Sequence, residues 1–409
     1  MTRLIAITGW KPWQRRLAWL HEQVRANPTM PYFLDERFGL ELAFDQIRRH
    51  YNQSGRYPWP PETPEQQRFY SFLAMVSRCH HRLNSKGKIR LKGMIVDALK
   101  SDSGFSPLAY EMKTVAHLMS QGFDVVFYDM DQGGGFDYLI EKDGIELEIE
   151  CKLISADIGR QIHPRKFHLL STTLLPEMAN ILSQEIGGYL IRITIPGRLN
   201  GDRRQHHEIR DLMLKAVADQ ETEMAQGEYK VSTSRFSISE SPFGNIPRDD
   251  ISMDHIQRFL LEGFEIEDRN VLVQFRPKNG AVLVIVESEK NDTVLKEIHH
   301  QLKKAARNQL IGELPGILCC ELSDLTEDQL LALGSAEELG TGIQYMISNL
   351  ITKCPKIHTV VFTSKGTVRM KKSSKDGLSA TSLQETGPAY TFINPDHPLA
   401  GDKRYDIFN

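Results

Sequence analysis

Three charged residues have the types and the spacing to act together on a phosphodiester bond. Asp137 opens one predicted strand, and Glu150 and Lys152 stand two residues apart on the next. Two carboxylates on neighbouring strands can converge on one side and offer the hard oxygen ligands that Mg²⁺ favours. Because side chains at i and i+2 share a strand face, Lys152 is expected beside the same metal, where it could orient a water molecule and offset phosphoryl charge. Glu111, on the preceding predicted helix, could add a further carboxylate.

Local patterns predict the elements that position these side chains. Ser106 and Pro107 begin a helix that stops at Gly122, since serine caps helices, proline suits their first position and glycine ends them. Next come strands over 123–130, 136–140 and 145–153, with a glycine turn at 133–135 and a two-residue hairpin turn at 143–144. No Lys-Ser or Lys-Thr follows the glycines, which favours a turn over a phosphate-binding loop.

The last of these strands alternates strictly between apolar and charged side chains. Ile145, Leu147, Ile149, Cys151 and Leu153 face one way, and Glu146, Glu148, Glu150 and Lys152 face the other. One face is therefore predicted to be core and the other a row of charges, of which Glu146 or Glu148 could be only solvated.

This arrangement resembles the restriction-endonuclease-like, or PD-(D/E)xK, nuclease superfamily over roughly residues 105 to 195. The resemblance rests on the early Glu111, on Asp137 at the start of a strand, and on Glu150-Cys151-Lys152, followed by a helix and a strand. It implies that Asp137 and Glu150 hold a divalent metal, Mg²⁺ or Mn²⁺, and that Lys152 assists the attacking water. Phe136 stands where the family often has proline, a tolerated variation.

The motif alone is short, so two other interpretations stay open. The charges could form the solvated face of an edge hairpin, or the fold could be a nuclease fold that has lost catalysis and serves as a nucleic-acid-binding or assembly subunit. The expected function is metal-dependent hydrolysis of nucleic acid, with DNA as the expected substrate, in defence, restriction or repair. One site per chain would favour a homodimer if both strands are cut.

Two basic segments are candidate contacts for phosphates. The first immediately follows the carboxylate-bearing strand and offers Arg160, Gln161, Arg165 and Lys166. The second runs from Arg78 to Lys92, contains Lys86 and Lys88, and has no acidic residue. For both segments, a solvated protein surface is the alternative. Tryptophans could stack on bases, although packing in the core is the favoured interpretation for Trp13.

The whole chain is expected to be α/β, with a restriction-endonuclease-like core in which helices flank a central mixed sheet. The predicted regions are a basic helical N-terminal region over 1–104, the nuclease core over 105–250 and a C-terminal α/β region over 251–409. The predicted elements beyond the hairpin are helices over 164–186, 205–225, 293–310 and 341–351, strands over 188–195, 316–322 and 359–362, a helix after 254, and a hairpin of 271–275 and 281–286 around Asn279-Gly280.

Composition is that of an ordinary folded protein: 409 residues, 40% hydrophobic and 25% charged, with a net charge of −3. The charge is unevenly spread, because residues 1–104 carry +8 (17 Lys and Arg, 9 Asp and Glu) and the remaining 305 carry −11 (33 and 44). No run is long and apolar enough for a membrane span, and the five scattered cysteines suggest reduced core residues. We therefore expect a cytoplasmic protein without a membrane partner.

Overall fold

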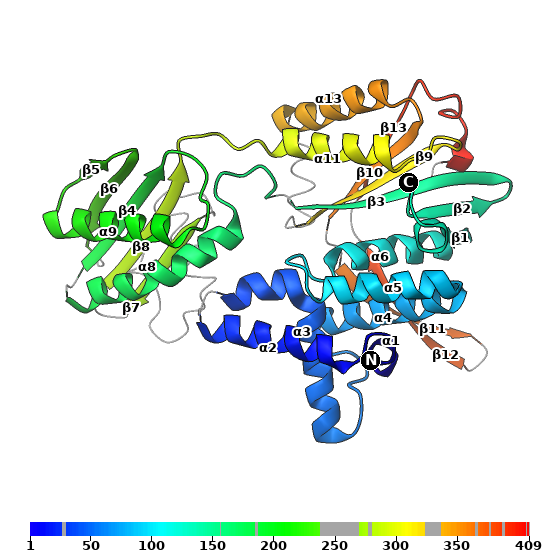
Figure 1. The fold of residues 1–409 in the computed structure, drawn as a ribbon, viewed down its shortest axis with the longest axis horizontal. Coiled ribbons are helices and arrows are strands. Elements are labelled where there is room, and N and C mark those ends of the chain that lie inside the picture. The colour runs from blue at the N-terminus through cyan, green and yellow to red at the C-terminus, as the bar shows by residue number, and fades with distance from the viewer. Residues whose placement is uncertain are drawn as a thin grey trace. The chain divides into compact units, whose positions relative to one another are not determined.

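The computed structural model describes residues 1–26, 30–155, 157–184, 187–237, 270–276, 280–323, 337–364, 367–375, 378–386, 389–405 and 407–408. The chain forms two compact units of the α/β class (Figure 1). The first unit combines Met1–Glu22, Leu34–Ile158 and Val294–Asn409, and the second combines Gln23–Phe33 and Gly159–Thr293. Over the ranges that the structure describes, no helix has the length and apolarity needed to cross a membrane.

The first unit is built on a mixed six-stranded sheet. Its strands, in spatial order, are β1 (Asp124–Phe127), β2 (Tyr138–Lys142), β3 (Ile145–Ser155), β9 (Gly316–Ser323), β10 (Ile357–Thr363) and β13 (Ala389–Ile393). The first three strands form an antiparallel meander, β3, β9 and β10 are parallel, and β13 closes the other edge antiparallel to β10. Central parallel strands are buried on both faces, which explains the continuous apolar run in β9 and β10.

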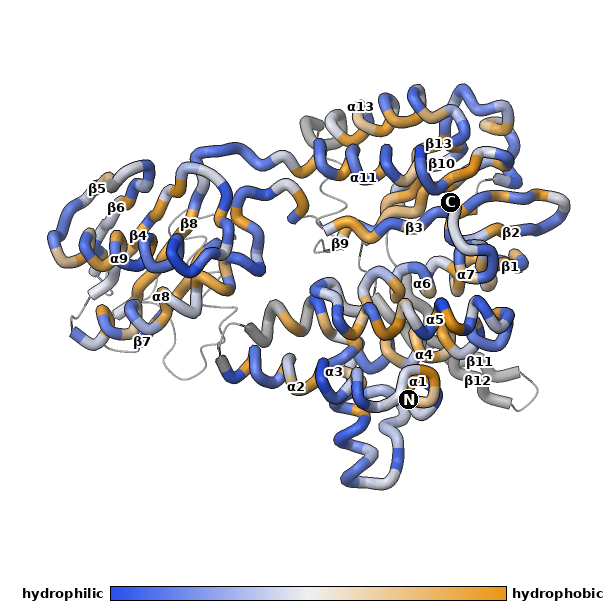
Figure 2. The backbone as a smooth tube through the Cα atoms, viewed as in Figure 1, coloured by the Kyte–Doolittle hydropathy of each residue, from blue (hydrophilic) through white to orange (hydrophobic). Residues whose placement is uncertain are grey.

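Helices cover both faces of this sheet. One face packs on α11 (Val294–Asn308) and α13 (Glu337–Lys353) through a cluster that includes Ile154, Leu302 and Leu318. Figure 2 shows hydrophobic segments alternating with hydrophilic ones along α11, as expected for a helix with one buried face. On the other side, α6 (Ser106–Ser120) contacts β1 and β3.

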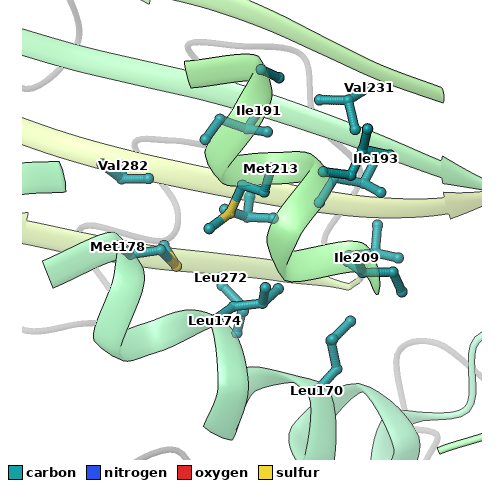
Figure 3. Close-up of a cluster of buried hydrophobic side chains, with 14 of the residues drawn as sticks. Leu170, Leu174, Met178, Ile191, Ile193, Ile209, Met213, Val231, Leu272 and Val282 are labelled. Carbon is teal, nitrogen blue, oxygen red and sulfur yellow. The ribbon is translucent and has the colours of Figure 1, made fainter. Parts of the chain in front are cut away.

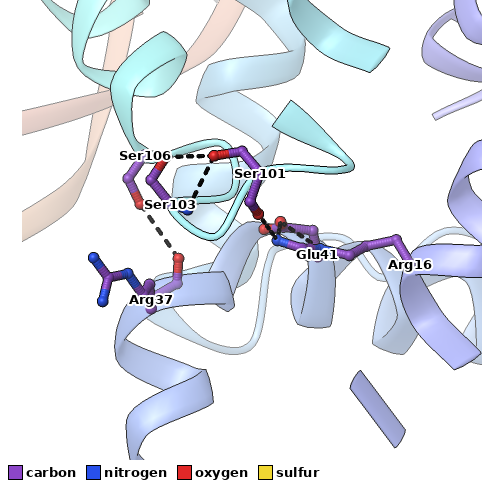
Figure 4. Close-up of polar contacts among 6 residues, drawn as sticks. All are labelled: Arg16, Arg37, Glu41, Ser101, Ser103 and Ser106. Atoms are coloured by element: carbon purple, nitrogen blue, oxygen red, sulfur yellow. Dashed lines mark hydrogen bonds and ion pairs between the residues drawn. The ribbon is translucent and has the colours of Figure 1, made fainter. Parts of the chain in front are cut away.

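The helices of the N-terminal region anchor α6. They are α1 (Thr2–Thr8), α2 (Trp10–Ala26), α3 (Met30–Ser54), α4 (Pro64–Arg82) and α5 (Ser85–Ala98). Arg16 of α2 pairs with Glu41 of α3 at 3.3 Å and donates a hydrogen bond of 2.8 Å to the carbonyl of Ser101 (Figure 4). Ser106, the first residue of α6, donates to the carbonyl of Arg37. These bonds fix the start of the helix that carries Glu111.

The structure confirms the prediction that Trp13 packs in a core, which is that of the first unit. Its side chain is fully buried and stacks on Phe44 and Phe105, with ring centroids 4.1 and 5.4 Å apart. Its indole N–H donates to Thr8 at 3.0 Å, so the polar atom is satisfied. Trp59, by contrast, is 62% exposed.

The second unit has its own five-stranded sheet and core. Its elements are α8 (Pro164–Gln184), β4 (Gly187–Ile195), α9 (Arg203–Asp219), β5 (Glu223–Gln226), β6 (Tyr229–Phe236), β7 (Val271–Arg276) and β8 (Gly280–Ser288), with strand order β5-β6-β4-β8-β7. Figure 3 shows Leu174 and Met178 of α8 and Met213 of α9 packed against Ile191 and Val282 of the sheet. All five of these side chains are fully buried.

The two compact units divide the chain at positions other than the predicted boundaries at residues 104 and 250. Strand 145–153 was expected to be followed within the same core by helix 164–186 and strand 188–195, but these form α8 and β4 of the second unit. The parallel neighbour of β3 is instead β9, with Glu150 opposite Leu318 and Lys152 opposite Cys320. Apart from Gln23–Phe33, the helical N-terminal region belongs to one unit with the meander and the chain from Val294 onward. Most of the second unit, Gly159–Thr293, is inserted after β3.

Several element boundaries also differ from prediction. The strand expected over 123–130 ends at Phe127, and the chain then forms the short helix α7 (Tyr128–Gln132). The helix expected over 205–225 ends at Asp219, where Gln220 adopts a left-handed conformation, and β5 follows. The hairpin of β7 and β8 is confirmed by pairs such as Phe275 with Ala281. The helix expected after 254 and Asn279 lie outside the described residues.

Two further strands belong to the chain after 364. The strands β11 (Thr367–Lys375) and β12 (Leu378–Thr386) pair antiparallel as a separate two-stranded sheet. A short 3₁₀ helix, Lys403–Tyr405, lies near the C-terminus.

Candidate functional site

Asp137 lies immediately before the first residue of β2, at the point where β3 extends beyond its antiparallel partner. The ladder between the two strands reaches Tyr138 opposite Ile149, and Asp137 adds one more bond by donating its N–H to the carbonyl of Ile149 at 3.0 Å. Beyond this point its carboxylate replaces the missing strand, because Oδ2 accepts a hydrogen bond of 2.7 Å from the N–H of Cys151. The backbone of β3 thus fixes Asp137 directly beside Glu150.

Glu150 and Lys152 project from β3 and form an ion pair through Oε1 and Nζ. Glu150 is fully buried, whereas the Lys152 side chain is 27% exposed. Among the described residues, nothing hydrogen-bonds to the buried Oε2 of Glu150. A buried carboxylate oxygen without a partner is costly, so a donor or a cation beyond those that the described residues supply would stabilise it.

Burial and mutual repulsion disfavour the ionised forms of these carboxyl groups. Burial raises the pKa of Asp137 to about 6, against the lowering effect of the Cys151 amide and Lys152. Burial and the charge of Asp137 raise the pKa of Glu150 to about 8. Burial by itself would lower the pKa of Lys152, but the charges of Glu150 and Asp137 outweigh it and raise that pKa. Lys152 is therefore charged and only partly neutralises the group.

Glu111 belongs to the same electrostatic cluster. It lies on α6, which contacts β3, and it is half-buried. Its pKa is raised well above the usual range by burial and then by the charge of Asp137, while Lys152 opposes the rise. The structure therefore brings together all four residues that the sequence singled out: Glu111, Asp137, Glu150 and Lys152.

A fifth charged residue, Asp129, was missed by the sequence prediction. Its charge raises the pKa values of Glu111, Asp137 and Glu150, which places it near all three. Residues 123–130 were predicted as one strand, which would have pointed Asp129 elsewhere. Instead, the carbonyl of Asp137 accepts the N–H of Tyr128 at 3.0 Å, and α7 begins there.

Arg90 of α5 and the glycine turn hold α7 in place. The Arg90 guanidinium donates to the carbonyls of Asp129 and Met130 at 2.9 and 2.8 Å. Gly133 has φ of 85°, and a side chain there would collide with Arg90. The N–H of Gly134 donates to Oδ1 of Asp129 at 2.9 Å. The glycines thus form the predicted turn, and the N–H of Gly134 is hydrogen-bonded to Asp129.

Glu148 has a structural task that separates it from the cluster. It is 1% exposed, and its carboxylate accepts the N–H groups of Ile311 and Gly312, at 2.8 and 3.0 Å, and of Leu314 at 3.4 Å. It therefore fastens the loop between α11 and β9 to β3. Glu146 is exposed, so of the two extra glutamates only Glu146 is a solvated charge.

The donor set suits a hard divalent cation, although the cluster is not arranged as a ready metal site. Within the described ranges, no group of three or more His, Cys, Asp or Glu side chains is placed to hold a metal ion. One oxygen of Asp137 and one of Glu150 are committed, to the Cys151 amide and to Lys152. Mg²⁺ is commonly bound through one or two carboxylates and several waters, and these contacts leave one oxygen uncommitted on each of Asp137 and Glu150.

The predicted phosphate contacts fall into both units. Arg160, Gln161, Arg165 and Lys166 belong to the second unit rather than to the unit with the carboxylates. Gln161 is engaged there, because its N–H donates to Asp292 at 2.8 Å and its side chain to the carbonyl of Asn291 at 3.1 Å.

Lys86 and Lys88 lie on α5 of the first unit, the helix that also carries Arg90. Lys86 is exposed and Lys88 is half-buried. These two lysines therefore share a unit with the carboxylate cluster.

Comparison with protein-family models, curated proteins and solved structures finds no match to this chain.

Proposed function

We propose that this chain is a metal-dependent nuclease whose active site is formed by Asp137, Glu150 and Lys152. The observation that carries the proposal is the buried, unpartnered Oε2 of Glu150, next to a carboxylate fixed by the β3 backbone and a single lysine. An excess of buried carboxylates calls for a cation, and a lysine beside them suits hydrolysis of a phosphate ester.

Topology supports the PD-(D/E)xK interpretation. The order α6, β1, β2, β3, then α11 and a β9 parallel to β3, follows the helix, meander, helix and strand of the resemblance. The helix and strand that follow β3 in this fold are α11 and β9, which come after the inserted second unit in the sequence, rather than residues 164–195. Asp137 and Glu150 lie at the end of the β2–β3 ladder, where β3 extends beyond β2.

Each residue has a distinct role in the proposed reaction. Asp137 and Glu150 would hold Mg²⁺ or Mn²⁺, which when bound would neutralise charge that develops on the phosphate. Lys152 would release Glu150 and orient the attacking water with its ammonium group. Asp129 would add negative charge that strengthens cation binding, and so would Glu111 once a bound cation favours its ionised form.

A second candidate is a nuclease-fold protein that binds nucleic acid without cutting it. It is favoured by the ion pair between Lys152 and Glu150, which occupies one ligand oxygen, and by the absence of a three-residue metal group among the described residues. In that case Lys152 is a permanent counter-ion of Glu150.

Cleavage assays separate the two candidates. Circular DNA, linear DNA and RNA are incubated with the full chain in Mg²⁺ or EDTA. We expect Mg²⁺-dependent cleavage, with DNA as the preferred substrate, that is lost in Asp137→Asn and Lys152→Ala. Glu146→Gln, which removes an exposed charge from the same strand, is the matched control and should cleave normally. Cleavage that survives both site substitutions would refute the assignment, and binding without cleavage of any substrate would favour the second candidate.

A further inference from the structure

A hollow lined by basic side chains lies between α1, α4 and α5 of the first unit. It has a volume of about 690 Å³ and opens to solvent. Its lining includes the apolar Ile7 and the 72%-exposed Ile89. Its charged or ionisable lining residues are Arg3, His80, Lys88 and Lys92.

The positive charge of this hollow is uncompensated. Among the described residues, Arg3, Lys88 and Lys92 form no ion pair, and the Arg3 guanidinium meets instead the imidazole of His80 at 3.4 Å. Burial and then the charges of Arg3 and Lys88 lower the pKa of His80. Like charges gathered without an acid repel one another, so an anion from outside would relieve the repulsion.

Several other cations of the first unit are held by carboxylates. Arg16 pairs with Glu41, Arg82 with Asp124, and Lys113 with Glu321. Arg3, Lys88 and Lys92 differ from these in lying together around one hollow without such a partner among the described residues.

The exposed ring of Tyr57 adjoins the hollow, and a second exposed ring, Trp59, follows it in the sequence. Thr2, which also lines it, is hydrogen-bonded through Oγ1 to the hydroxyl of Tyr57 at 3.2 Å. Tyr57 is 40% exposed and stacks on Tyr51 with centroids 4.5 Å apart. Trp59, two residues further, is 62% exposed. Flat rings beside a cationic groove are the combination that binds unpaired bases and their phosphates.

We propose that this hollow and the rings of Tyr57 and Trp59 form a binding surface for single-stranded nucleic acid. Phosphates occupy the hollow among Arg3, Lys88 and Lys92, and bases stack on the rings. A duplex can use the cations, but its bases are stacked on one another and cannot use the rings. The inference rests on the proposed function, since it names the form of nucleic acid that reaches the same unit as the carboxylates.

The test measures binding rather than cleavage. Full-length Asp137→Asn protein in EDTA is titrated into fluorescein-labelled single-stranded DNA, single-stranded RNA and duplex DNA, and anisotropy is followed at several salt concentrations. We expect single strands to bind more tightly than the duplex. The Lys88→Ala, Lys92→Ala pair should lower the salt slope for single strands by about 1.4, because each phosphate contact contributes about 0.7.

Ring variants test the stacking part. Tyr57→Ala and Trp59→Ala should each weaken single-strand binding roughly tenfold and leave duplex binding unchanged. The matched controls are Lys100→Ala, an exposed lysine just after α5, and Tyr345→Ala, a 72%-exposed tyrosine on α13, and both should bind as the parent does. Circular dichroism of every variant checks that the fold is retained, which is expected because the replaced side chains are at the surface.

Three results would overturn the inference: tighter binding of the duplex, equal loss with the control variants, or displacement of the oligonucleotide by inorganic phosphate at a similar concentration of phosphate groups. The last result would indicate a site for small anions. These outcomes are independent of the proposed function, because protein with an intact Asp137 can still be assayed for Mg²⁺-dependent cleavage. Binding as expected without any cleavage would instead refute only the nuclease proposal.

Discussion

Replacing Asp137 by asparagine should stabilise the metal-free protein, the reverse of what most substitutions do. The pKa of Asp137 is about 6 in the folded protein and ordinarily 3.8. Each pKa unit corresponds to about 1.36 kcal/mol, so ionised Asp137 costs roughly 3 kcal/mol of folding free energy at high pH. Asparagine is neutral and keeps an oxygen for the Cys151 N–H, although a weaker acceptor. We therefore expect a gain of about 1 to 3 kcal/mol at pH 8.

The sign of the pH dependence follows from the raised pKa. Stability that protonated Asp137 confers is fully present below pH 3.8 and is lost as the pH rises through about 6. The advantage of Asp137→Asn should therefore be smaller at pH 5 than at pH 8. Asp137→Ala also removes the charge but leaves the Cys151 N–H without its acceptor, so it should be less stable than Asp137→Asn by about 1 to 3 kcal/mol.

Urea unfolding in EDTA, followed by tryptophan fluorescence, measures these differences. All four tryptophans lie in the first unit, so the signal reports on the unit that carries Asp137. Added Mg²⁺ should stabilise the wild type by mass action and leave Asp137→Asn unchanged. The reasoning is refuted if Asp137→Asn is less stable than the wild type at pH 8, or if its advantage is the same at pH 5 and pH 8.

Two further predictions concern buried carboxylates outside the cluster. Glu148→Ala should destabilise the first unit by at least about 2 kcal/mol in urea unfolding, because three backbone N–H groups lose their acceptor. The matched control, Glu146→Ala, removes an exposed carboxylate and should change stability by less than about 0.5 kcal/mol. Equal effects of the two substitutions would contradict the structural role of Glu148. Burial raises the pKa of Glu41 to about 7, so stability that its protonated form confers is present below pH 4.5 and lost as the pH rises through 7. Glu41→Gln should remove a decline of roughly 3 kcal/mol between pH 4.5 and 8, and an unchanged decline would show that other groups cause it.

Much of the candidate site could be predicted from the sequence because its geometry is local. The alternation along residues 145–153 and the Asp143-Gly144 turn define a hairpin, and a hairpin determines which residues stand opposite each other. That register alone predicts that Asp137 and Glu150 lie next to each other. Helices and strands such as α8, β4, α11 and β10 were also predicted close to their observed places.

The partner of β3 could not be predicted, because strand pairing across a long insertion leaves no local signal. Both β4 and β9 are apolar runs that suit a buried parallel strand, and β4 is nearer in the sequence. The choice of β9 is made by packing, since α11 and α13 bury their apolar faces against β9 and β10. The two-unit organisation follows from that choice.

Asp129 was missed for a related reason. The run Phe123 to Met130 is rich in residues that favour strands, and this pattern hides the turn into α7. Contacts with distant residues form that turn: Asp137 accepts the N–H of Tyr128, and Arg90 binds two carbonyls of α7. Neither contact can be predicted from the composition of this segment.

Anomalous diffraction from crystals soaked in Mn²⁺ at about pH 8 tests the central claim most directly. We predict a single strong peak in this cluster, in contact with a carboxylate oxygen of Asp137 and with Oε2 of Glu150, and none in crystals of Asp137→Asn. A wild-type map with no peak between these two carboxylates would contradict the account.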